Sequence, residues 1–398
     1  MRKNKSFFNN VFFVGLLSFF GGISQDIILP ILPLYLANVL NFDKSFIGLT
    51  EGLVTSGASI FKLFAGILSD KLKLRKSIVF AGYFLSFVSR PLLAIFTSFW
   101  AISILRFSDG VGKGIKESPK DALIADSTLP QNRGKGFGIA RMLDTFGSVV
   151  GPLLLFALLY LLQNNNFKYH YIFFIAAIPL IFTLLILVIF VKETPFKTTN
   201  YEQRTNKLTN NKGLPFKFYM FLLIISVFAL GNSSDAFLIL RAQNLGVGLL
   251  SIPLIYALFN FIYASFSVPL GGLSDKIGRE KVIILGWFAY ALSYLGFALA
   301  SNSIHVWILF AFYGIYYATT TGVSKAFVAD LITPENRGTA YGIYNTAIGL
   351  ITLPASVIAG ILWDKFNPSA PFLFGSAVAG FSTILMLIFI KSHRIKTA

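Results

Sequence analysis

Long apolar segments fill this chain, and short polar segments separate them. Each apolar segment is about 20 residues long, the length that an α-helix needs to cross the hydrocarbon core of a bilayer. The pattern therefore predicts an all-α polytopic membrane protein with about 12 transmembrane helices. The expected spans lie near residues 11–38, 46–68, 77–97, 100–121, 135–162, 169–191, 217–241, 249–272, 281–300, 303–327, 337–363 and 370–390.

The two halves of the chain repeat each other. The segment GILSDK at Gly66–Lys71 recurs as GGLSDK at Gly271–Lys276, and ADSTLPQNRG at Ala125–Gly134 recurs as ADLITPENRG at Ala329–Gly338. Both repeats have an offset of about 205 residues. Two unrelated segments at one offset predict a parallel repeat of six-span units, an architecture that secondary transporters use.

This repeat divides the chain into two lobes and a connection. Residues 1–191 form the predicted first lobe of six helices, and residues 217–398 form the second. Residues 192–216, rich in Lys, Asn and Thr, form the predicted linker.

One predicted span, the fourth, carries a stripe of charged side chains. Their three- and four-residue spacing places them on one helix face, within an arc of about 100°. Charges at membrane depth are costly unless they face water, a partner charge or a substrate. We expect the deeper part of the stripe to belong to a functional site and its inner part, from Lys116 to Asp126, to run into a cytoplasmic gate. The stripe consists of Arg106, Asp109, Lys113, Lys116, Glu117 and Lys120.

Charge and composition agree with a membrane protein. The chain is 55% hydrophobic and 13% charged, whereas soluble domains have about 25% charged residues. Its net charge of +17 comes mostly from Lys and Arg in alternate short loops, a pattern that indicates membrane orientation and not nucleic-acid binding. We expect both termini and the linker to be cytoplasmic, in a protein of the cytoplasmic (inner) membrane.

The residue inventory argues against an enzyme. The chain has no Cys, so it has no thiolate metal site and no Cys nucleophile. Its three histidines, His170, His305 and His393, lie at span ends without spacing for metal binding or nucleophilic catalysis. We therefore expect no catalytic residues, no metal and no cofactor.

The repeated loops resemble the major facilitator superfamily. Gly271–Lys281, GGLSDKIGREK, is similar to that family's loop between the second and third helices of a half. Gly66–Lys76, GILSDKLKLRK, is a weaker copy in which Lys73 replaces the usual Gly. We expect Gly66 and Gly271 to let helices approach closely.

Two further segments extend the resemblance over nearly the whole chain. Arg106-x-x-Asp109-Gly110-x-Gly112 resembles the family's fourth-helix motif, with Asp where Gln is more usual. Gly147-Ser-Val-Val-Gly151-Pro152 resembles the fifth-helix motif of the family's exporters, without the trailing glycines. The resemblance implies a two-lobed bundle with a central cavity lined by spans one, four, seven and ten. It also implies alternating access by rocking of the lobes, coupled to protons or another ion.

Charged residues cluster in the repeated loops. By resemblance, they latch the lobes together on the cytoplasmic side; the alternative is that they only set topology and keep the loops soluble. A latch requires a network, because isolated surface ion pairs contribute only about 0–1 kcal/mol. The candidate gate residues are Asp70, Lys71, Arg75, Asp126, Arg133, Asp275, Lys276, Arg279, Asp330 and Arg337.

The first lobe also places carboxylates and cations at membrane depth. Burial raises the proton affinity of a carboxylate and a nearby cation lowers it, so moving the cation could couple rocking to proton uptake. The alternative is a static salt-bridge core that pins spans four and five together. Glu51, Lys62 and Arg90 also lie inside spans, and we expect Lys62 and Arg90 to pair within the lobe or to extend toward an interface. The candidate proton or substrate-charge residues are Asp26, Arg106, Asp109, Lys113, Arg141 and Asp144.

The second lobe replaces these charges by aromatic and hydroxyl side chains. At the repeat offset, Tyr313 and Tyr317 stand where the fourth span has Asp109 and Lys113. We hypothesise a division of labour, in which the first lobe handles charge and the second offers a wall for an organic substrate; the alternative is ordinary packing of aromatic side chains. The candidate substrate-cavity residues are Asn232, Asp235, Tyr313, Tyr317, Thr321 and Asn345.

The sequence thus predicts a secondary active transporter for a small organic solute, proton-coupled and with efflux favoured. A second possibility is a proton-coupled importer of an organic anion or metabolite, and a remote one is a sensor built on a transporter scaffold. The expected partners are a small-molecule substrate, a proton or other coupling ion, and the lipid bilayer, with no nucleic acid. The expected state is a monomer.

Overall fold

The apolar segments of the sequence form helices, because a backbone in lipid must satisfy its hydrogen bonds internally. The computed structural model describes residues 2–72, 74–128, 133–193, 214–333 and 336–394, and omits the side chains of 2–9, 63, 70, 133–135, 337–338 and 393–394. The first half contains α1 (Arg2–Asn38), α2 (Lys44–Leu72), α3 (Arg75–Leu92), α4 (Phe99–Asp126), α5 (Arg133–Leu161) and α6 (Lys168–Ile189). The second half contains α8 (Phe216–Gly231), α9 (Ala236–Asn244), α10 (Ser251–Ile277), α11 (Arg279–Leu299), α12 (Ser303–Leu331), α13 (Arg337–Lys365) and α14 (Ala370–Arg394).

These helices form twelve spans in the described chain, as the apolar pattern predicts, if α8 and α9 are counted together. The seventh span is interrupted between these two helices. The span expected near 217–241 is present, and the residues Asn232 to Asp235 divide it into α8 and α9. Short polar side chains compete with the helix for backbone hydrogen bonds. Here the Ser234 amide donates to Ser356 Oγ of α13 at 3.2 Å, which satisfies one peptide group that the interruption frees.

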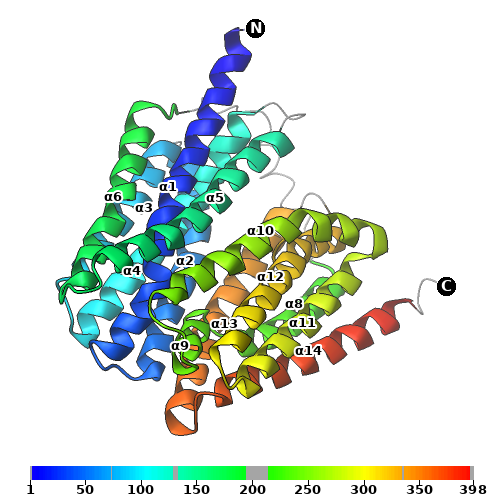
Figure 1. Ribbon diagram of the computed structural model, residues 1–398. Coiled ribbons are helices and arrows are strands. Elements are labelled where there is room, and N and C mark those ends of the chain that lie inside the picture. Colours follow the sequence, from blue (N-terminus) through cyan, green and yellow to red (C-terminus); the bar gives the residue numbers. More distant parts are fainter. Residues whose placement is uncertain (1, 73, 129–132, 194–213, 334–335, 395–398) are drawn as a thin grey trace.

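Ten segments of the described chain, with α8 and α9 taken as one, are long and apolar enough to cross a membrane. The helices α3 and α4 do not reach that standard, although both lie within the bundle (Figure 1). Both are polar for a reason that the site explains: α3 carries Arg90, and α4 carries the charged stripe.

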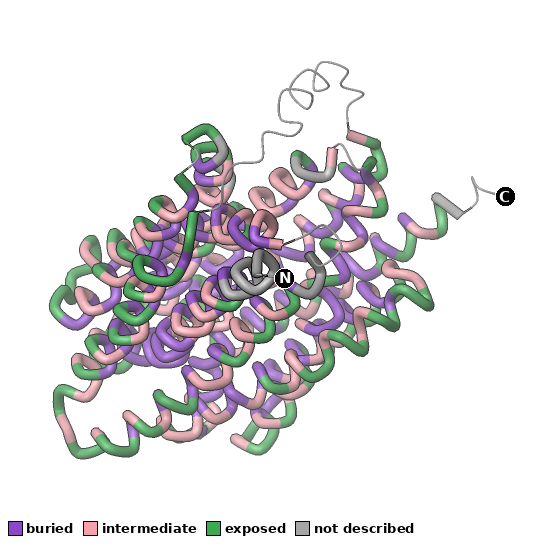
Figure 2. The backbone as a smooth tube through the Cα atoms, turned by 90° about the horizontal axis from the view of Figure 1, so that it is seen from above, coloured by how far each residue is buried: buried purple, intermediate pink, exposed green. Residues whose placement is uncertain are grey.

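The helices group into two lobes that lie side by side in Figure 1. In the first lobe α1 packs on α5 and α6, and α4 packs between α2 and α3. In the second, α12 packs on α10 and α11, and α14 packs on α8 and α11. Exposed residues run along the outer sides of the bundle and buried ones lie between the helices (Figure 2). Many of the exposed side chains are large and apolar, as a lipid-facing surface requires.

Glycines of the fourth-helix motif determine how closely α4 packs. A methyl group at Gly110 or Gly114 would collide with the backbone of α2, at Val54 and Ala58. A Cβ at Gly112, on another face, would lie 2.6 Å from the carbonyl oxygen of Gly82 in α3. Small residues therefore hold α4 tightly on both sides, which leaves the charged stripe facing the space between the lobes.

The lobes contact each other mainly through α2 with α13 and α5 with α10. We call the end of the bundle where α1 begins and α14 ends the terminal end. At the opposite end, the Asp364 carboxylate at the end of α13 accepts hydrogen bonds from the first two amides of α2, those of Lys44 at 3.1 Å and Ser45 at 2.8 Å. Further along α2, Gly48 packs so closely on α13 that a methyl group would collide with the Ser356 carbonyl. The lobes are therefore closed together at this end.

The described start of the linker is fixed to the first lobe. The Glu193 carboxylate accepts hydrogen bonds from the first two amides of α3, those of Arg75 at 3.1 Å and Lys76 at 2.8 Å. A carboxylate at a helix N-terminus satisfies free amides and interacts favourably with the helix dipole. The rest of the predicted linker, from 194 to 213, lies outside the described residues.

Candidate functional site

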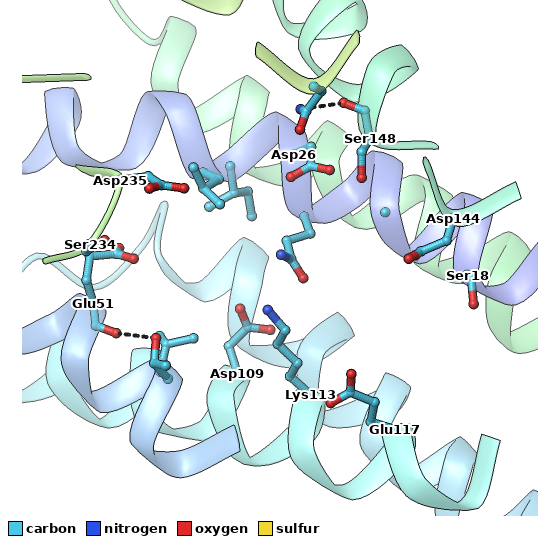
Figure 3. A pocket seen from close by; sticks show the side chains of 18 of the residues that line it. Ser18, Asp26, Glu51, Asp109, Lys113, Glu117, Asp144, Ser148, Ser234 and Asp235 are labelled. Carbon is cyan, nitrogen blue, oxygen red and sulfur yellow. Dashed lines mark hydrogen bonds between the residues drawn. The ribbon is translucent and has the colours of Figure 1, made fainter. Parts of the chain in front are cut away.

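A cavity of about 540 Å³ lies between the two lobes. Helices of both lobes line it, including α1, α2, α4 and α5 from the first and α10, α12 and the α8–α9 interruption from the second. Figure 3 shows Asp26 and Asp235 projecting into it from one side, and Asp109, Lys113 and Glu117 of α4 from the other. Its volume lies within the range of about 300–1,000 Å³ that is typical of small-molecule sites.

The structure brings together most of the residues that the sequence proposes for the site. All six candidate proton or substrate-charge residues line the cavity, as do Asn232, Asp235, Tyr317 and Thr321. Tyr313 lies behind the wall and reaches the site through Asp235. Asn345 does not line the cavity; its amide donates to the Tyr341 carbonyl one turn earlier, at 2.8 Å.

The charged stripe of α4 enters the cavity along its whole length. Lys116, Glu117 and Lys120 line it together with Arg106, Asp109 and Lys113. The inner part of this helix, which is expected to run into the gate, therefore also contributes three side chains to the cavity.

Two arginines hold Asp109 from different helices. Arg90 Nε of α3 lies 3.3 Å from one carboxylate oxygen of Asp109, and Arg106 Nη1 lies 3.8 Å from the other. Arg106 also donates to Glu51 of α2, at 2.5 Å. Removing one partner from such a buried network costs about 3–5 kcal/mol, because a charge remains unpaired. The network therefore fixes α2, α3 and α4 against one another.

Arg90 extends this network to α1 and α6. Its Nη1 donates to Ser24 Oγ of α1 at 2.5 Å, and that hydroxyl donates to the Ala176 carbonyl of α6. The expectation that Arg90 and Lys62 pair within the lobe is confirmed: Lys62 Nζ lies 3.0 Å from the Glu117 carboxylate.

Asp26 and Asp235 differ from the other acids of the cavity because no Lys or Arg nitrogen of a described side chain lies within 4.0 Å of either carboxylate. Asp26, on α1, is 6% exposed and lies close to Ser148 of α5 (Figure 3). Asp235, at the start of α9, accepts hydrogen bonds from Tyr313 at 2.7 Å and from Tyr317 at 3.1 Å. Hydroxyl groups lie next to these two acids, and no described cation lies within salt-bridge distance of them.

Arg141 and Asp144 of α5 form a more exposed pair. The Arg141 guanidinium lies 3.1 Å from the Asp144 carboxylate and donates to Tyr263 Oη of α10 at 2.9 Å, across the lobe boundary. The Arg141 side chain is 62% exposed, whereas that of Asp109 is 11% exposed. Since Arg141 lies closer to the terminal end, the cavity opens toward that end and closes toward the other.

The gate residues form ion pairs within the lobes. Arg75 pairs with Asp126 in the first lobe, and Arg279 pairs with Asp330 in the second at 2.7 Å. The two pairs occupy equivalent positions of the repeat, and Asp275 lies 3.5 Å from Arg279. Among the side chains that the structure describes, no ion pair joins the lobes at the terminal end and none involves Lys71 or Lys276.

The remaining gate candidates, Asp70, Arg133 and Arg337, have side chains outside the described part. The prediction that Gly66 and Gly271 let helices approach closely has a different outcome at each glycine. A Cβ at Gly66 would lie 3.5 Å from the Ser118 side chain of α4, whereas nothing described lies within 4 Å of that position at Gly271. Among the described residues no helix approaches Gly271 closely, so the expectation is not met there in this conformation.

Sequence reasoning missed several residues of the cavity. Glu51 and Arg90 were noticed as charges inside spans but were not assigned to the site, although an intramembrane charge is by itself a signal of function. Asn260 gave no comparable signal: its amide donates to the Ser148 carbonyl across the lobe boundary at 2.9 Å. Tyr256 and Tyr263 also line the cavity and could not be told from packing residues by sequence.

Comparison with known proteins places the chain in a family. The family model described as Major Facilitator Superfamily matches residues 14–239 and 219–398. An MFS-type transporter of Methanocaldococcus jannaschii is 40% identical over 95% of this chain and 94% of its own length. The multidrug resistance protein MdtG of Proteus mirabilis is 27% identical over 99% of both chains.

The fold is also similar to that of solved structures of this superfamily. The crystal structure of a D-xylose-proton symporter superimposes with a TM-score of 0.78 over 96% of each chain, at 18% identity. Together with the twelve spans, the parallel repeat and the cavity between the lobes, these matches show that the chain belongs to the major facilitator superfamily, whose members are membrane transporters and not enzymes.

Proposed function

We propose that this transporter moves a small organic solute by alternating access, that it is coupled to protons, and that it exports its substrate. The observation that carries the proposal is the pair Asp26 and Asp235, two carboxylates that face one cavity from opposite lobes and have no ion-pair partner among the described side chains. A carboxylate in such surroundings binds a proton more readily than one held by an arginine.

The proposed coupling uses the difference between these acids and Asp109. Arginines hold the charge of Asp109 within one lobe, so rocking of the lobes leaves that network intact. Asp26 and Asp235 belong to different lobes, and their surroundings change when the lobes move. Protonation would neutralise them for the conformational change, and exposure on the other side would release the protons.

We infer the orientation from the positive charges of the loops. The terminal end, with both termini and the linker 192–216, would face the cytoplasm, so the cavity would open inward in this conformation. The lobes 1–191 and 217–398 would rock about the cavity, and the ion pairs of the loops would rearrange into a cytoplasmic latch in the outward-open state. The setting would be the cytoplasmic membrane and the protein would act as a monomer.

Export is supported by the fifth-helix motif and by the likeness to MdtG. Glycines of this motif bring α5 against α1: a methyl group at Gly147 would collide with the Phe19 carbonyl, and a Cβ at Gly151 would lie 3.0 Å from the Asp26 side chain. The motif therefore shapes the surroundings of a proposed proton site. The second candidate is import of an organic anion or metabolite, for which the same acids would serve.

Vesicles with a proton gradient test the proposal and separate the two directions. We expect inside-out vesicles, acidified inside, to accumulate the substrate from a panel of small organic anions, cations and neutral compounds. Right-side-out vesicles with an acidic exterior should not accumulate it. Accumulation in the right-side-out vesicles would indicate import, and accumulation that ignores the gradient would contradict proton coupling.

Asp364 provides a test of alternating access. Asp364→Asn weakens the two hydrogen bonds that join the end of α13 to the start of α2 and removes the charge that favours the helix N-terminus. We expect this to destabilise the conformation that is closed at this end by about 1 kcal/mol, a several-fold shift toward the outward-open state. Thiol labelling of Thr352→Cys in the cavity measures the shift, and unchanged labelling from both faces would contradict it.

A further inference from the structure

Three lysines of α4 line the cavity without a carboxylate partner. No carboxylate oxygen of a described side chain lies within 4.0 Å of the ammonium groups of Lys113, Lys116 or Lys120. Their spacing of three and four residues aligns them along the face of α4 that lines the cavity. We call these three residues the lysine stripe.

Three acids near the lysine stripe are already paired with other cations. Glu117 lies between Lys116 and Lys120 in the sequence, but its carboxylate pairs with Lys62 at 3.0 Å. Asp144 pairs with Arg141 at 3.1 Å, and Asp109 with Arg90 at 3.3 Å. Each arginine of the cavity thus has a carboxylate partner, whereas the three lysines have none among the described side chains.

Uncharged side chains contact two ammonium groups of the lysine stripe. Lys116 is 8% exposed, and its ammonium lies 4.2 Å from the centre of the Tyr83 ring. Lys120 Nζ donates to the hydroxyl of Ser18 on α1 at 2.8 Å. A buried ammonium is unfavourable without a countercharge, so a negatively charged group entering the cavity would relieve this cost.

The second lobe faces the cavity with aromatic side chains. Phe259 and Tyr263 of α10 are stacked with their ring centres 6.5 Å apart, and Tyr317 of α12 packs edge-on against Phe259 at 5.1 Å. All three line the cavity. Aromatic side chains offer a large apolar surface and prefer to pack on other rings.

We propose that the lysine stripe binds the anionic group of an organic substrate whose aromatic body packs on Phe259, Tyr263 and Tyr317. The substrate class is thus an aromatic carboxylate, sulfonate or phosphate small enough for a cavity of about 540 Å³. This inference rests on the proposed function, since it names the substrate of that same cavity. Because the stripe and the aromatic side chains belong to different lobes, such a substrate would contact both.

Three probes with one ring body test the charge requirement. They are 2-naphthoate, the neutral 2-naphthamide and the cationic 2-naphthylmethylammonium, titrated calorimetrically into the full-length protein in lipid nanodiscs. We expect 2-naphthoate to bind at least about tenfold more tightly than either analogue, as charged hydrogen bonds allow. Inorganic phosphate, which lacks the ring, should bind more weakly than 2-naphthoate; equal or tighter binding would contradict the role of the aromatic side chains.

Substitutions then assign the binding to the lysines. Lys113→Gln and Lys116→Gln are each expected to weaken 2-naphthoate binding by about tenfold, and Lys116→Arg should retain it. The matched control is Lys168→Gln. Lys168 lies at the opposite end of the bundle and outside the cavity, and its ammonium lies 5.8 Å from the centre of a tyrosine ring. Unchanged binding in both stripe variants would overturn the inference, as would an equal loss in the control. If Lys116→Gln does not fold, Lys113→Gln decides alone.

Flux measurements separate this inference from the proposed function. Binding of 2-naphthoate at the lysines without any gradient-driven flux would support the site and contradict the transport proposal. Proton-coupled flux of the cationic or neutral analogue, with no advantage for 2-naphthoate, would support transport and overturn the substrate class. Failure of all anionic probes to bind would also overturn it.

Discussion

Asp26→Asn is expected to reduce proton-driven transport by at least about tenfold while substrate exchange across the membrane continues. Asn has nearly the shape of a protonated Asp but cannot bind or release the proton. The lobes should therefore still rock around the substrate, and only the coupling should be lost. Asp235→Asn should act in the same way, because Tyr313 and Tyr317 can still donate hydrogen bonds to the amide oxygen.

The comparison with the other acids makes this expectation specific. Asp144→Asn is the matched control, since that acid is more exposed and lies beside Arg141; it should retain most of the coupling. Asp109→Asn should instead lower the yield of folded protein, because it leaves Arg90 and Arg106 with a weakened partner at a cost of about 3–5 kcal/mol. A folded but uncoupled Asp109→Asn, together with a fully coupled Asp26→Asn, would move the proton site to Asp109.

Gly48→Leu is expected to have the second large effect, by preventing closure of the lobes at the end opposite the termini. The Gly48 position touches the Ser356 carbonyl of α13, so any side chain there must push α2 and α13 apart. Neither lobe needs this contact for its own packing, so the protein should fold. We expect transport to fall by at least about tenfold, since one of the two alternating states is lost.

Thiol labelling in the Cys-free chain measures this effect. With Thr352→Cys in the cavity, an impermeant reagent should label the otherwise unchanged protein mainly from the terminal face and the Gly48→Leu variant mainly from the opposite face. Gly380→Leu in α14 is the control, because nothing described lies within 4 Å of its Cβ position. Equal labelling of both variants would show that the contact at Gly48 does not control closure.

The sequence predicts well what depends on spacing along one helix. The six charges of α4 line one cavity because a helix of 3.6 residues per turn places them on one face. The pairing of Arg141 with Asp144 also follows from a spacing of three residues. The lengths of the apolar segments predict the twelve spans for the same local reason.

Contacts between different helices could not be predicted from the sequence. Arg106 pairs with Glu51 on α2, and Arg90 with Asp109 on α4, only because glycines set the distances between these helices. Periodicity cannot give that packing. The interruption before Asp235 was also missed, since the flanking apolar residues make one hydrophobic segment; the run of Asn, Ser, Ser and Asp was the available signal.

The loop charges show a third limit. Spacing and repeat predicted correctly that Asp126 and Asp330 are equivalent, but not which partner each has in a given conformation. In this structure Arg75 and Arg279 bind them within their own lobes. The proposed latch across the lobes would belong to another conformation, and the sequence does not say which conformation is populated.

The most direct test of the account is the proton movement that a substrate gradient drives. Vesicles containing the protein and an internal pH-sensitive dye would be given an outward gradient of the transported solute, with no initial pH difference. Solute efflux in exchange for protons should acidify the interior, and the variant with both Asp26→Asn and Asp235→Asn should release solute by exchange without this acidification. A double variant that acidifies the interior as fast as the unchanged protein would contradict the assignment of the coupling protons to Asp26 and Asp235.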